Sequence, residues 1–584
     1  MHGDRRPSHT AADGHPRRLL PPRRRSAEYP RRQPQHPEAL LAVTGKPHLR
    51  DLVAHAGAER DASAVPGAFS EATIVRPMMT ALLERAEGRR IEASTVLESA
   101  ARAELGQFFT PASAAALIAR TARVTDDAHT LRILDPGSGS GMLTTALVAR
   151  VLAETSRTLH IVAVERDPIL IPFLNATLED CTIASNGRMT YQVIEGDYIE
   201  LATGTTDSRL LNFDVVIQNP PYRKLASSSA HRRLLRDAGV DAPNLYAAFL
   251  ALGTQALKPG GQLVAITPRS FANGPHFGAF RHYLLDQVSF DRVHIFESRA
   301  KVFADTGVLQ DNIIFSATKG GAHDSIVLSV SSDHENNVVC RTAAYSAVVH
   351  VNDPHRFIRL ATTDADDELS ERFLSLPATL DNLTLEASTG RVVDFRSRAS
   401  IRETPQPTSA PLIYPGNLRA GRVNWPRTDI RKPQWFEPET ARDNSLLMPS
   451  GWYCVVKRFS AKEERRRIVA AVWSPTQAPG PVAFENHLNV FHSGGAGIDE
   501  STAKGLCLWL NSTLVDRFFR TFSGHTQVNA TDLRSMRYPD ATTLRRLGAE
   551  APSCLPSQTQ VDNLVESALT SWDLRRRART KAAG

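Results

Sequence analysis

The sequence predicts an α/β fold for its middle part, with a mostly parallel sheet and helices on both faces. Over residues 105–320, short apolar runs of strand character alternate with segments of helical character. The expected strands are Leu131–Leu134, His160–Val164, Tyr191–Ile194, Phe213–Ile217, Gln262–Ile266, Arg292–Phe296 and Asn312–Ser316. Helices are expected between them, such as Gly141–Glu154 and Tyr246–Leu257. Beyond residue 320 the pattern is irregular, with short strand-like pieces at Ser325–Val330, Trp452–Val456 and Ile468–Val472.

Length and composition are those of a globular protein with several domains. The chain has 584 residues, of which 42% are hydrophobic and 22% charged. No run approaches the roughly 18–20 apolar residues of a membrane-spanning helix, and the Arg- and Pro-rich beginning is not followed by a secretory signal. The five cysteines lie far apart, which excludes a zinc ribbon and a disulfide scaffold and favours a cytoplasmic setting without a bound metal.

The basic residues are unevenly distributed. Residues 1–40 hold nine Arg against four acidic residues, and residues 391–540 hold 21 basic against 14 acidic residues. We therefore expect a disordered basic leader at 1–45, a helical segment at 46–104, the α/β domain at 105–320, a further region at 321–570 and a basic tail at 571–584. The local positive charge of the C-terminal half indicates an anionic partner.

The first expected strand leads into a Gly-rich turn, Asp135-Pro136-Gly137-Ser138-Gly139-Ser140-Gly141, that opens a helix. Glycines let the backbone approach a ligand closely, and a helix start offers N–H donors. The turn is neither a phosphate loop, since no Gly-Lys-Ser/Thr follows, nor a GxGxxG fingerprint. By itself it is equally consistent with a plain tight turn.

The next two strands end in carboxylates, Glu165 and Asp197. Glu165 stands about where doubly wound folds place an acid for ribose hydroxyls, at the edge where open α/β sheets bind ligands. Asp197 can accept a hydrogen bond from an exocyclic amine. The structural alternatives are a solvated acid for Glu165 and a turn-initiating residue for Asp197.

The fourth strand runs into Asn219-Pro220-Pro221-Tyr222. The prolines fix φ and remove two donors, which leaves neighbouring carbonyls available to a ligand. Asn219 adds an acceptor and Tyr222 a flat apolar face. This set suits a planar group that bears an NH₂.

These motifs, in this order, resemble those of gamma-class N6-adenine DNA methyltransferases of type II restriction–modification systems, in particular the PstI/BsuBI-like group. Asn219 to Tyr222 resembles their motif IV and Asp135 to Gly141 their motif I. Leu105-Gly106-Gln107-Phe108-Phe109-Thr110-Pro111 resembles motif X. Further similarity lies at Thr267–Phe271, at Asn273–Phe277 and at Phe522–Ala530, where His525, Gln527 and Asn529 suit either a DNA groove or a structural loop.

The resemblance implies a Rossmann-like S-adenosylmethionine-dependent methyltransferase domain, followed by a mixed α+β target-recognition domain. It implies that the cofactor is held by Thr110, Asp135, Gly137, Gly139, Gly141, Glu165 and Asp197. Asn219 and the Pro220 carbonyl would accept hydrogen bonds from N6 of a flipped-out adenine, with Pro221 stiffening the motif and Tyr222 stacking on the base. Phe277 is the expected second aromatic against the base, and Phe271 is the alternative.

Two basic clusters in the C-terminal region are candidate contacts to double-stranded DNA. The first contains Arg419, Arg422, Arg427, Arg431 and Lys432, near Tyr414, Trp425 and Trp435, and the second contains Lys457, Arg458, Lys462, Arg465, Arg466 and Arg467. From these we select Arg419, Arg422, Arg427, Lys432, Lys457 and Arg458 as the expected contacts. A charge run can also be merely a solvated face, as Glu463 and Glu464 beside the second cluster indicate.

Other functions remain open from the residues alone. The same motif can act on cytosine N4 or on a protein glutamine amide. A fused restriction enzyme would need a nuclease motif, which we do not find before residue 105, so a separate cognate endonuclease is the expected partner. A non-catalytic DNA-binding module would not need Asn219 to Tyr222.

Overall fold

The computed structural model describes residues 69–97, 109–204, 208–296, 311–332, 338–350, 353–361, 363–460, 464–523 and 527–583. The leader expected at 1–45 lies outside these ranges, as do Leu105–Phe108 of the motif X resemblance. The described residues all belong to one compact unit.

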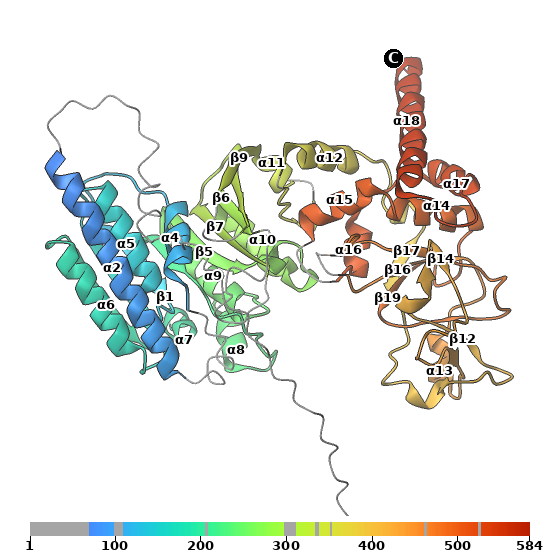
Figure 1. The fold of residues 1–584 in the computed structure, drawn as a ribbon, viewed down its shortest axis with the longest axis horizontal. Helices are drawn as coiled ribbons and strands as arrows, with labels where there is room; N and C mark the ends of the chain where they lie inside the picture. The colour runs from blue at the N-terminus through green and yellow to red at the C-terminus, as the bar shows by residue number, and fades with distance from the viewer. Residues whose placement is uncertain are drawn as a thin grey trace, which may run out of the picture. The chain divides into compact units, whose positions relative to one another are not determined.

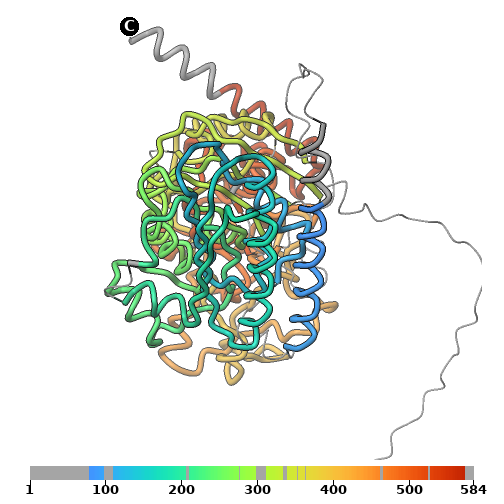
Figure 2. The backbone as a smooth tube through the Cα atoms, turned by 90° about the vertical axis from the view of Figure 1, so that its left-hand side faces the viewer, coloured from blue at the N-terminus to red at the C-terminus, as the bar shows by residue number. Residues whose placement is uncertain are grey.

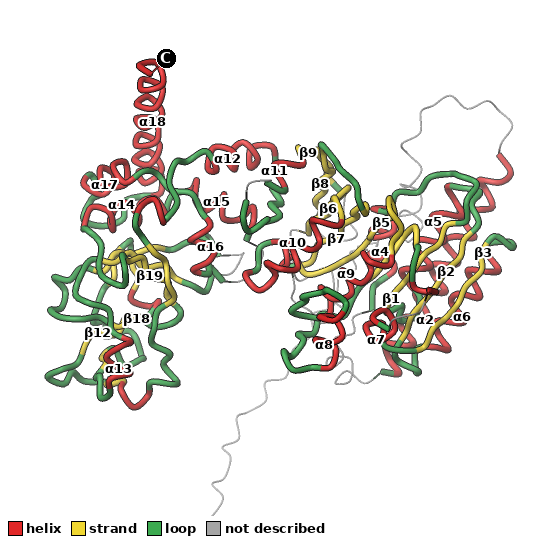
Figure 3. Tube along the Cα trace, turned by 180° about the vertical axis from the view of Figure 1, so that it is seen from behind, coloured by secondary structure: helices red, strands yellow, loops and turns green. Residues whose placement is uncertain are grey.

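A nine-stranded sheet forms the core of the first half, in the order β3-β2-β1-β4-β5-β7-β6-β8-β9 (Figure 3). The strands are β1 (Leu131–Pro136), β2 (Leu159–Glu165), β3 (Met189–Glu195), β4 (Phe213–Gln218), β5 (Leu257–Pro268), β6 (Val288–Phe296), β7 (Asn312–Lys319), β8 (Ser325–Ser331) and β9 (Val339–Ala344). The five strands from β3 to β5 in this order run parallel, and β7 lies antiparallel between β5 and β6. All seven predicted strands are confirmed.

The sheet extends past residue 320, where the sequence analysis ended the α/β domain. β8 pairs parallel with β6, and β9 pairs antiparallel with β8. β9 is an edge strand with a mostly exposed pattern, and β8 alternates between buried and partly exposed positions. Strands of this kind lack the continuous apolar run of a buried parallel strand, so the sequence does not distinguish them from the irregular region that follows.

Helices cover both faces of this sheet (Figures 1 and 2). One face carries α2 (Phe69–Val96), α4 (Ala112–Thr121), α5 (Met142–Glu154) and α6 (Ile171–Ala184). The other carries α7 (Tyr198–Thr203), α8 (Ala230–Asp237), α9 (Leu245–Ala256) and α10 (Gly278–Gln287). In α2 the spacing of Met79, Leu82, Leu83 and Ala86 places four buried side chains on one stripe, as an amphipathic helix requires.

The strand order reverses between β1 and β4, whose neighbours continue the sheet in opposite directions. In an open α/β sheet, such a reversal leaves a crevice at the carboxyl ends of the two strands. The Gly-rich turn follows β1 and Asn219 follows β4. The topology therefore brings the two motifs to the same place.

The second half contains two smaller sheets and a group of helices. A six-stranded sheet has the order β10-β19-β16-β17-β14-β13, and a four-stranded sheet has the order β11-β15-β12-β18. The strands are β10 (Glu386–Thr389), β11 (Ile401–Arg402), β12 (Ala410–Ile413), β13 (Leu418–Arg419), β14 (Arg422–Val423), β15 (Trp435–Phe436), β16 (Tyr453–Lys457), β17 (Ala470–Trp473), β18 (Ala483–Phe484) and β19 (Leu488–His492). The helices are α11 (Tyr345–Val348), α12 (Asp364–Leu374), α13 (Ala441–Leu446), α14 (Glu500–Leu510), α15 (Thr513–Phe522), α16 (Ala530–Ser535), α17 (Ala541–Ala549) and α18 (Gln558–Ala583).

The six-stranded sheet separates two hydrophobic cores. Cys454 and Val456 of β16 pack with the helices α12 and α14–α18 on one face, whereas Tyr453 and Val455 pack on the other face. This alternation is the period-two pattern of a sheet buried on both sides. The region predicted as mixed α+β therefore contains both kinds of element.

Candidate active site

The loop after β1 is anchored to the end of β2. Gly137, Gly139 and Gly141 have φ angles of 79°, 57° and 85°, in the left-handed region that favours glycine. The backbone N–H groups of Gly137 and Ser138 donate to the Val164 carbonyl at 2.8 and 2.9 Å. The sequence of this loop is thus dictated by its backbone conformation.

Asp135 and Gly141 connect this loop to the neighbouring helices α5 and α6. Asp135 is fully buried, and its Oδ2 accepts a hydrogen bond from Thr144 Oγ1 of α5 at 2.6 Å. Burial raises the pKa of Asp135 to about 7. A Cβ at Gly141 would meet the side chains of Leu174 and Thr177 at 3.1 and 3.2 Å, so glycine permits the close packing of the loop on α6.

Glu165 and Asp197 lie at neighbouring strand ends, as predicted. Glu165 Oε2 accepts a hydrogen bond from Gly139 N at 2.7 Å, and Oε1 accepts from the backbone N–H groups of Arg166 and Asp167, both at 2.8 Å. Burial raises the pKa of the Glu165 carboxyl. Asp197 Oδ1 caps α7 by accepting from Ile199 N at 2.9 Å, so the turn-forming role considered for Asp197 is present in the structure.

Two basic side chains that the sequence analysis did not select face Asp197. Its Oδ2 lies 3.2 Å from Arg166 Nη1 and 3.3 Å from His231 Nε2. Arg166 adjoins Glu165 in the sequence, which was an available signal. His231 belongs to no recognised motif, and only the position of α8 brings it to this edge of the sheet.

Asn219 stands at the centre of a short hydrogen-bond network. Its Nδ2 donates to Thr110 Oγ1 at 3.0 Å, and its Oδ1 accepts from the Tyr222 hydroxyl at 3.0 Å. Burial raises the pKa of Tyr222 well above its usual range, so the phenol keeps its proton and acts as the donor. These two bonds orient the amide, and they join the segment before α4 to the segment after β4.

A series of aromatic rings in contact with one another begins at Tyr222. Tyr246 of α9 makes an edge contact with Tyr222, with ring centroids 6.2 Å apart, and stacks on Phe277 at 5.6 Å. Phe277 is partly buried, whereas Phe271 is fully buried against Phe280 and Phe315. Of the two predicted alternatives, Phe277 therefore lies in the ring series that begins at Tyr222 and retains exposed surface, and Phe271 belongs to the core.

A cavity of about 360 Å³ joins these groups. Six of the predicted residues line it, namely Gly137, Gly139, Glu165, Asp197, Asn219 and Pro221. Thr110, Asp135, Gly141, Pro220, Tyr222 and Phe277 are not among its lining residues, and they support or adjoin it instead. Phe109, Leu170 and Phe249 provide apolar walls that carried no predicted role.

The cavity fits a ligand that combines a planar ring with hydroxyl groups. Its volume falls within the range of about 300–1,000 Å³ that is usual for small-molecule sites. The carboxylates of Glu165, Asp167 and Asp197 offer acceptors, and aromatic rings offer apolar contacts. The Gly-rich loop brings backbone rather than side chains to the wall, since a Cβ at Gly137 would lie 3.3 Å from the Phe249 ring.

In the C-terminal half, Arg419 and Arg422 lie directly opposite each other on the β13–β14 hairpin. Both are exposed, and neither makes an ion pair or a side-chain hydrogen bond with another described residue. Like charges opposite each other on a hairpin destabilise it. The turn between them is held in place, because Leu555 N donates to Ala420 O at 2.9 Å.

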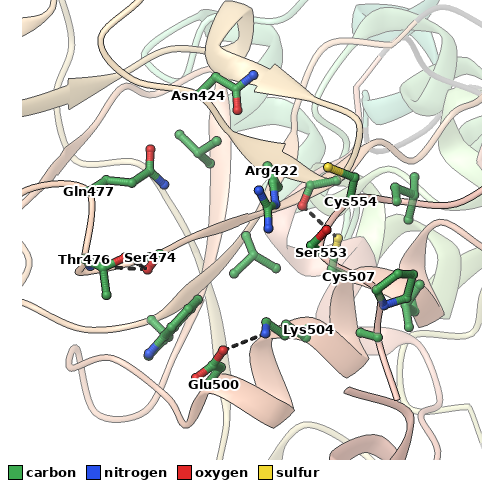
Figure 4. A pocket seen from close by; sticks show the side chains of 18 residues that line it. Arg422, Asn424, Ser474, Thr476, Gln477, Glu500, Lys504, Cys507, Ser553 and Cys554 are labelled. Atoms are coloured by element: carbon green, nitrogen blue, oxygen red, sulfur yellow. Dashed lines mark hydrogen bonds and ion pairs between the residues drawn. The ribbon is translucent and has the colours of Figure 1, made fainter. Parts of the chain in front are cut away.

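Arg422 reaches into a cavity of about 450 Å³ (Figure 4). The walls come from β14, from β17 with the turn that follows it, from α14 and from residues 551–555. Asn424, Gln477 and Ser474 supply neutral polar groups, while Lys504 pairs with Glu500 at 2.6 Å. The guanidinium of Arg422 is thus the main uncompensated charge among the described lining residues.

The other four predicted DNA contacts are engaged within the protein. Arg427 pairs with Asp429, and Lys432 pairs with Asp394 at 2.7 Å. Lys457 pairs with Glu464 at 3.0 Å, and Arg458 donates to the Asn486 carbonyl at 3.2 Å. His525 lies outside the described residues, whereas Gln527 accepts a hydrogen bond from Arg458 at 3.3 Å.

The described part of the chain contains neither a metal-site arrangement nor a membrane-spanning helix. No group of three or more His, Cys, Asp or Glu residues there has the arrangement of a metal site. Among the helices with described residues, none is both long and apolar enough to cross a membrane.

The chain is similar to methyltransferases of restriction–modification systems. Residues 191–303 match the family model described as Eco57I restriction-modification methylase. The type II methyltransferase M.BsuBI of Bacillus subtilis is 39% identical over 503 residues, which cover 84% of this chain and 99% of the relative. M.PstI of Providencia stuartii is 37% identical over 488 residues, 82% of this chain and 96% of the relative.

A solved structure, that of the type IIL restriction-modification enzyme MmeI in complex with DNA, matches 85% of this chain and 74% of that chain. Its TM-score is 0.47 and its sequence identity 11%.

The fold and the site define the class of protein. A mostly parallel sheet with an antiparallel β7, and a Gly-rich loop beside two strand-end carboxylates, make this a Rossmann-like, doubly wound α/β fold. The chain belongs to the family of the type II methyltransferases M.BsuBI and M.PstI of restriction–modification systems. The resemblance stated from the motifs is confirmed.

Proposed function

We propose that this protein transfers a methyl group from S-adenosylmethionine to N6 of a flipped-out adenine in double-stranded DNA. It serves as the modification enzyme of a restriction–modification system, and a separate cognate endonuclease cleaves the unmodified sites. The observation that carries the proposal is the orientation of the Asn219 amide by Thr110 and Tyr222, at the mouth of a cavity lined by Glu165 and Asp197.

Asn219 prepares the target amine. An amide oxygen has two lone pairs, so Oδ1 can accept from the Tyr222 hydroxyl and from a substrate amine together. With the Pro220 carbonyl it draws the amine, whose lone pair is delocalised into the ring, towards sp³ character. Because Thr110 holds the amide nitrogen, the oxygen is aimed before the substrate arrives, and preorganised acceptors of this kind lower the barrier.

The cofactor cavity suits an adenosyl group. Glu165 would accept hydrogen bonds from ribose hydroxyls and Asp197 from the adenine amine, and the ring would lie between the apolar walls. When bound, S-adenosylmethionine supplies an electrophilic methyl group. The Gly137–Gly141 loop would hold the methionine part of the cofactor. Thr110 would affect this part only indirectly, through its position beside the loop.

The target base must leave the duplex, because its amine is inaccessible within the helix. Extrusion costs a few kcal/mol, and stacking on aromatic rings returns roughly 1–3 kcal/mol per base. Tyr222 and Phe277, joined through Tyr246, supply such rings next to Asn219. Arg419 and Arg422 would hold the DNA backbone, since phosphates neutralise their mutual repulsion.

The test is methyl transfer to unmethylated duplex DNA. Labelled S-adenosylmethionine is incubated with the full chain and DNA, and the DNA is digested to nucleosides. We expect the label in N6-methyladenine, and we expect Asn219→Ala to lower the rate by about a hundredfold or more, as for loss of one preorganised group. The exposed Asn444→Ala in α13 is the matched control and should keep full activity.

Each other outcome identifies another function. Label in N4-methylcytosine would keep the chemistry and change the base. Label absent from DNA but present in a glutamine-bearing protein substrate would replace DNA as the substrate. An Asn219→Ala variant that binds DNA and methylates it normally would refute the role of Asn219.

A further inference from the structure

The segment that follows the catalytic motif leaves the sheet and returns beside its own starting point. Lys224 and Asn244 form an antiparallel bridge. Leu225 N donates to Pro243 O at 3.2 Å, and Leu245 N donates to Arg223 O at 2.9 Å. The base of this closed segment, residues 223–245, therefore begins directly after Tyr222.

The far part of the segment, α8, reaches the cofactor cavity through His231. This residue lines the cavity, and its Nε2 lies 3.3 Å from Asp197 Oδ2 and 3.9 Å from Glu200 Oε1. The side chains of His231 and Asp197 are only 22% and 13% exposed, so solvent screens the pair incompletely. Asp197 also caps α7, and it thereby connects α7 and α8 at one carboxylate.

Apolar packing also holds α8, because Leu235 lies in the core of the large sheet and the helix lies against α7, but few of the described polar contacts join α8 to the rest of the domain. Leu235 is its only buried residue. Arg232 pairs with Asp241 at 3.1 Å, but both residues belong to the closed segment itself. The contact between His231 and Asp197 is thus a main tie between α8 and the strand end that carries a proposed cofactor ligand.

We propose that His231 is a positioning residue that couples cofactor binding to the placement of the 223–245 segment. A ligand that fills the cavity touches both Asp197 and the His231 wall, so it stabilises α8 in its docked position. By linkage, docking of α8 strengthens binding of the ligand by the same factor. Because the base of the segment adjoins Tyr222, a bound cofactor also steadies the catalytic motif. The inference rests on the proposed function in one respect, that the ligand is an adenosyl compound.

The first measurement is cofactor affinity without catalysis. S-adenosylhomocysteine is titrated calorimetrically into the full chain and its variants. We expect His231→Ala to weaken binding by about tenfold, within the range usual for a coupling between two sites. His231→Gln places an N–H donor at similar reach and should bind within about threefold of the unchanged chain.

The matched control is His323→Ala. His323 Nε2 lies 2.9 Å from Asp291 Oδ1 with a similar exposure of 27%, and His323 does not line the cavity. This variant removes an equivalent His–Asp pair elsewhere in the same domain. It should bind S-adenosylhomocysteine as the unchanged chain does.

The second measurement reports on the segment itself. Arg233 and Arg236 are exposed on α8 and provide trypsin sites. S-adenosylhomocysteine should slow cleavage after them in the unchanged chain and in His231→Gln, but not in His231→Ala at a ligand concentration that saturates each protein. In methyl transfer, His231→Ala should raise KM for the cofactor while kcat at saturation changes less.

The outcomes separate the two proposals. If His231→Ala binds S-adenosylhomocysteine and is protected from trypsin like the unchanged chain, the coupling is refuted and the proposed function stands. If His231→Gln binds S-adenosylhomocysteine as weakly as His231→Ala and is likewise not protected from trypsin, a polar side chain at position 231 does not restore the coupling. The inference is then also refuted. If the unchanged chain does not bind the compound at all, both proposals fall.

Discussion

At the scale of single residues, buried polar groups decide how the site is held. Asp135 has no exposed surface, and only one of its carboxylate oxygens has a described hydrogen-bond partner, Thr144. An ionised carboxylate in this position is costly, which is why its pKa rises from the ordinary 3.8 to about 7. The nearby charge of Glu165 adds to this rise.

This raised pKa makes stability depend on pH. Between pH values near 3.8 and near 7, the folded state binds more protons at Asp135 than the unfolded state, so the free energy of unfolding falls as pH rises. Asp135→Asn cannot ionise, and it should be more stable than the unchanged chain at about pH 8 and much closer to it at about pH 5. Urea unfolding at both pH values measures this. Asp381→Asn, at an exposed site, is the control, and a constant difference at both pH values would contradict the assignment.

At the scale of elements, the β13–β14 hairpin is the strongest candidate contact to DNA among the described residues. A two-residue turn places Arg419 and Arg422 opposite each other, and neither forms an ion pair with another described residue, although Arg419 adds to the effect of Arg427 in lowering the pKa of Asp429. Arg427, Lys432, Lys457 and Arg458 are engaged internally. Ion pairs within the protein reduce the charge that is available to phosphates. Counting the basic residues of the two sequence clusters therefore overestimates how many positive charges are available to DNA phosphates.

The salt dependence of DNA binding tests the hairpin. Each phosphate contact adds about 0.9 to the slope of log K against log salt, so Arg419→Ala with Arg422→Ala should lower the slope by about 1.8 and weaken binding at low salt. Arg372→Ala is the matched control, because Arg372 already pairs with Glu566 at 2.7 Å. Equal slopes for the double variant and the control would exclude a phosphate contact at this hairpin.

At the scale of the whole molecule, the short segment 357–360 packs into two hydrophobic cores and so connects them. Phe357 packs in the core of the C-terminal helices, whereas Ile358 and Leu360 pack in the core of the large sheet. Beside it, the Thr521 carbonyl accepts hydrogen bonds from Arg269 Nη2 at 2.7 Å and from Leu360 N at 2.9 Å. The buried guanidinium of Arg269, with its pKa lowered by burial, thus links the two halves of the chain.

Removing this link should destabilise the molecule. Arg269→Met removes the hydrogen bond from the buried guanidinium to the Thr521 carbonyl, and a hydrogen bond made by a charged group contributes about 1.5–3 kcal/mol. Chemical denaturation followed by fluorescence measures the change. The exposed Arg372→Ala should cost less than about 1 kcal/mol. A similar small change for Arg269→Met would show that the link contributes little.

The local pattern of the sequence determined much of the catalytic half. Strand and helix periodicity located β1 to β7, the glycines marked a loop that needs positive φ, and Asn219 to Tyr222 marked the motif that follows β4. These signals are readable because each depends on residues next to each other in the chain. β8 and β9 escaped prediction as part of the sheet, since the partly exposed strand β8 and the edge strand β9 carry a weaker pattern.

Only the tertiary structure decided which side chains meet. Thr110 contacts Asn219 across 109 positions of sequence, and His231 reaches Asp197 from a helix that carries no motif. The structure likewise distinguishes Arg422, which enters a cavity, from Lys432, which is paired with Asp394. Periodicity reports whether a residue is buried, but the partner of a polar side chain depends on how distant segments pack, and no local pattern encodes that.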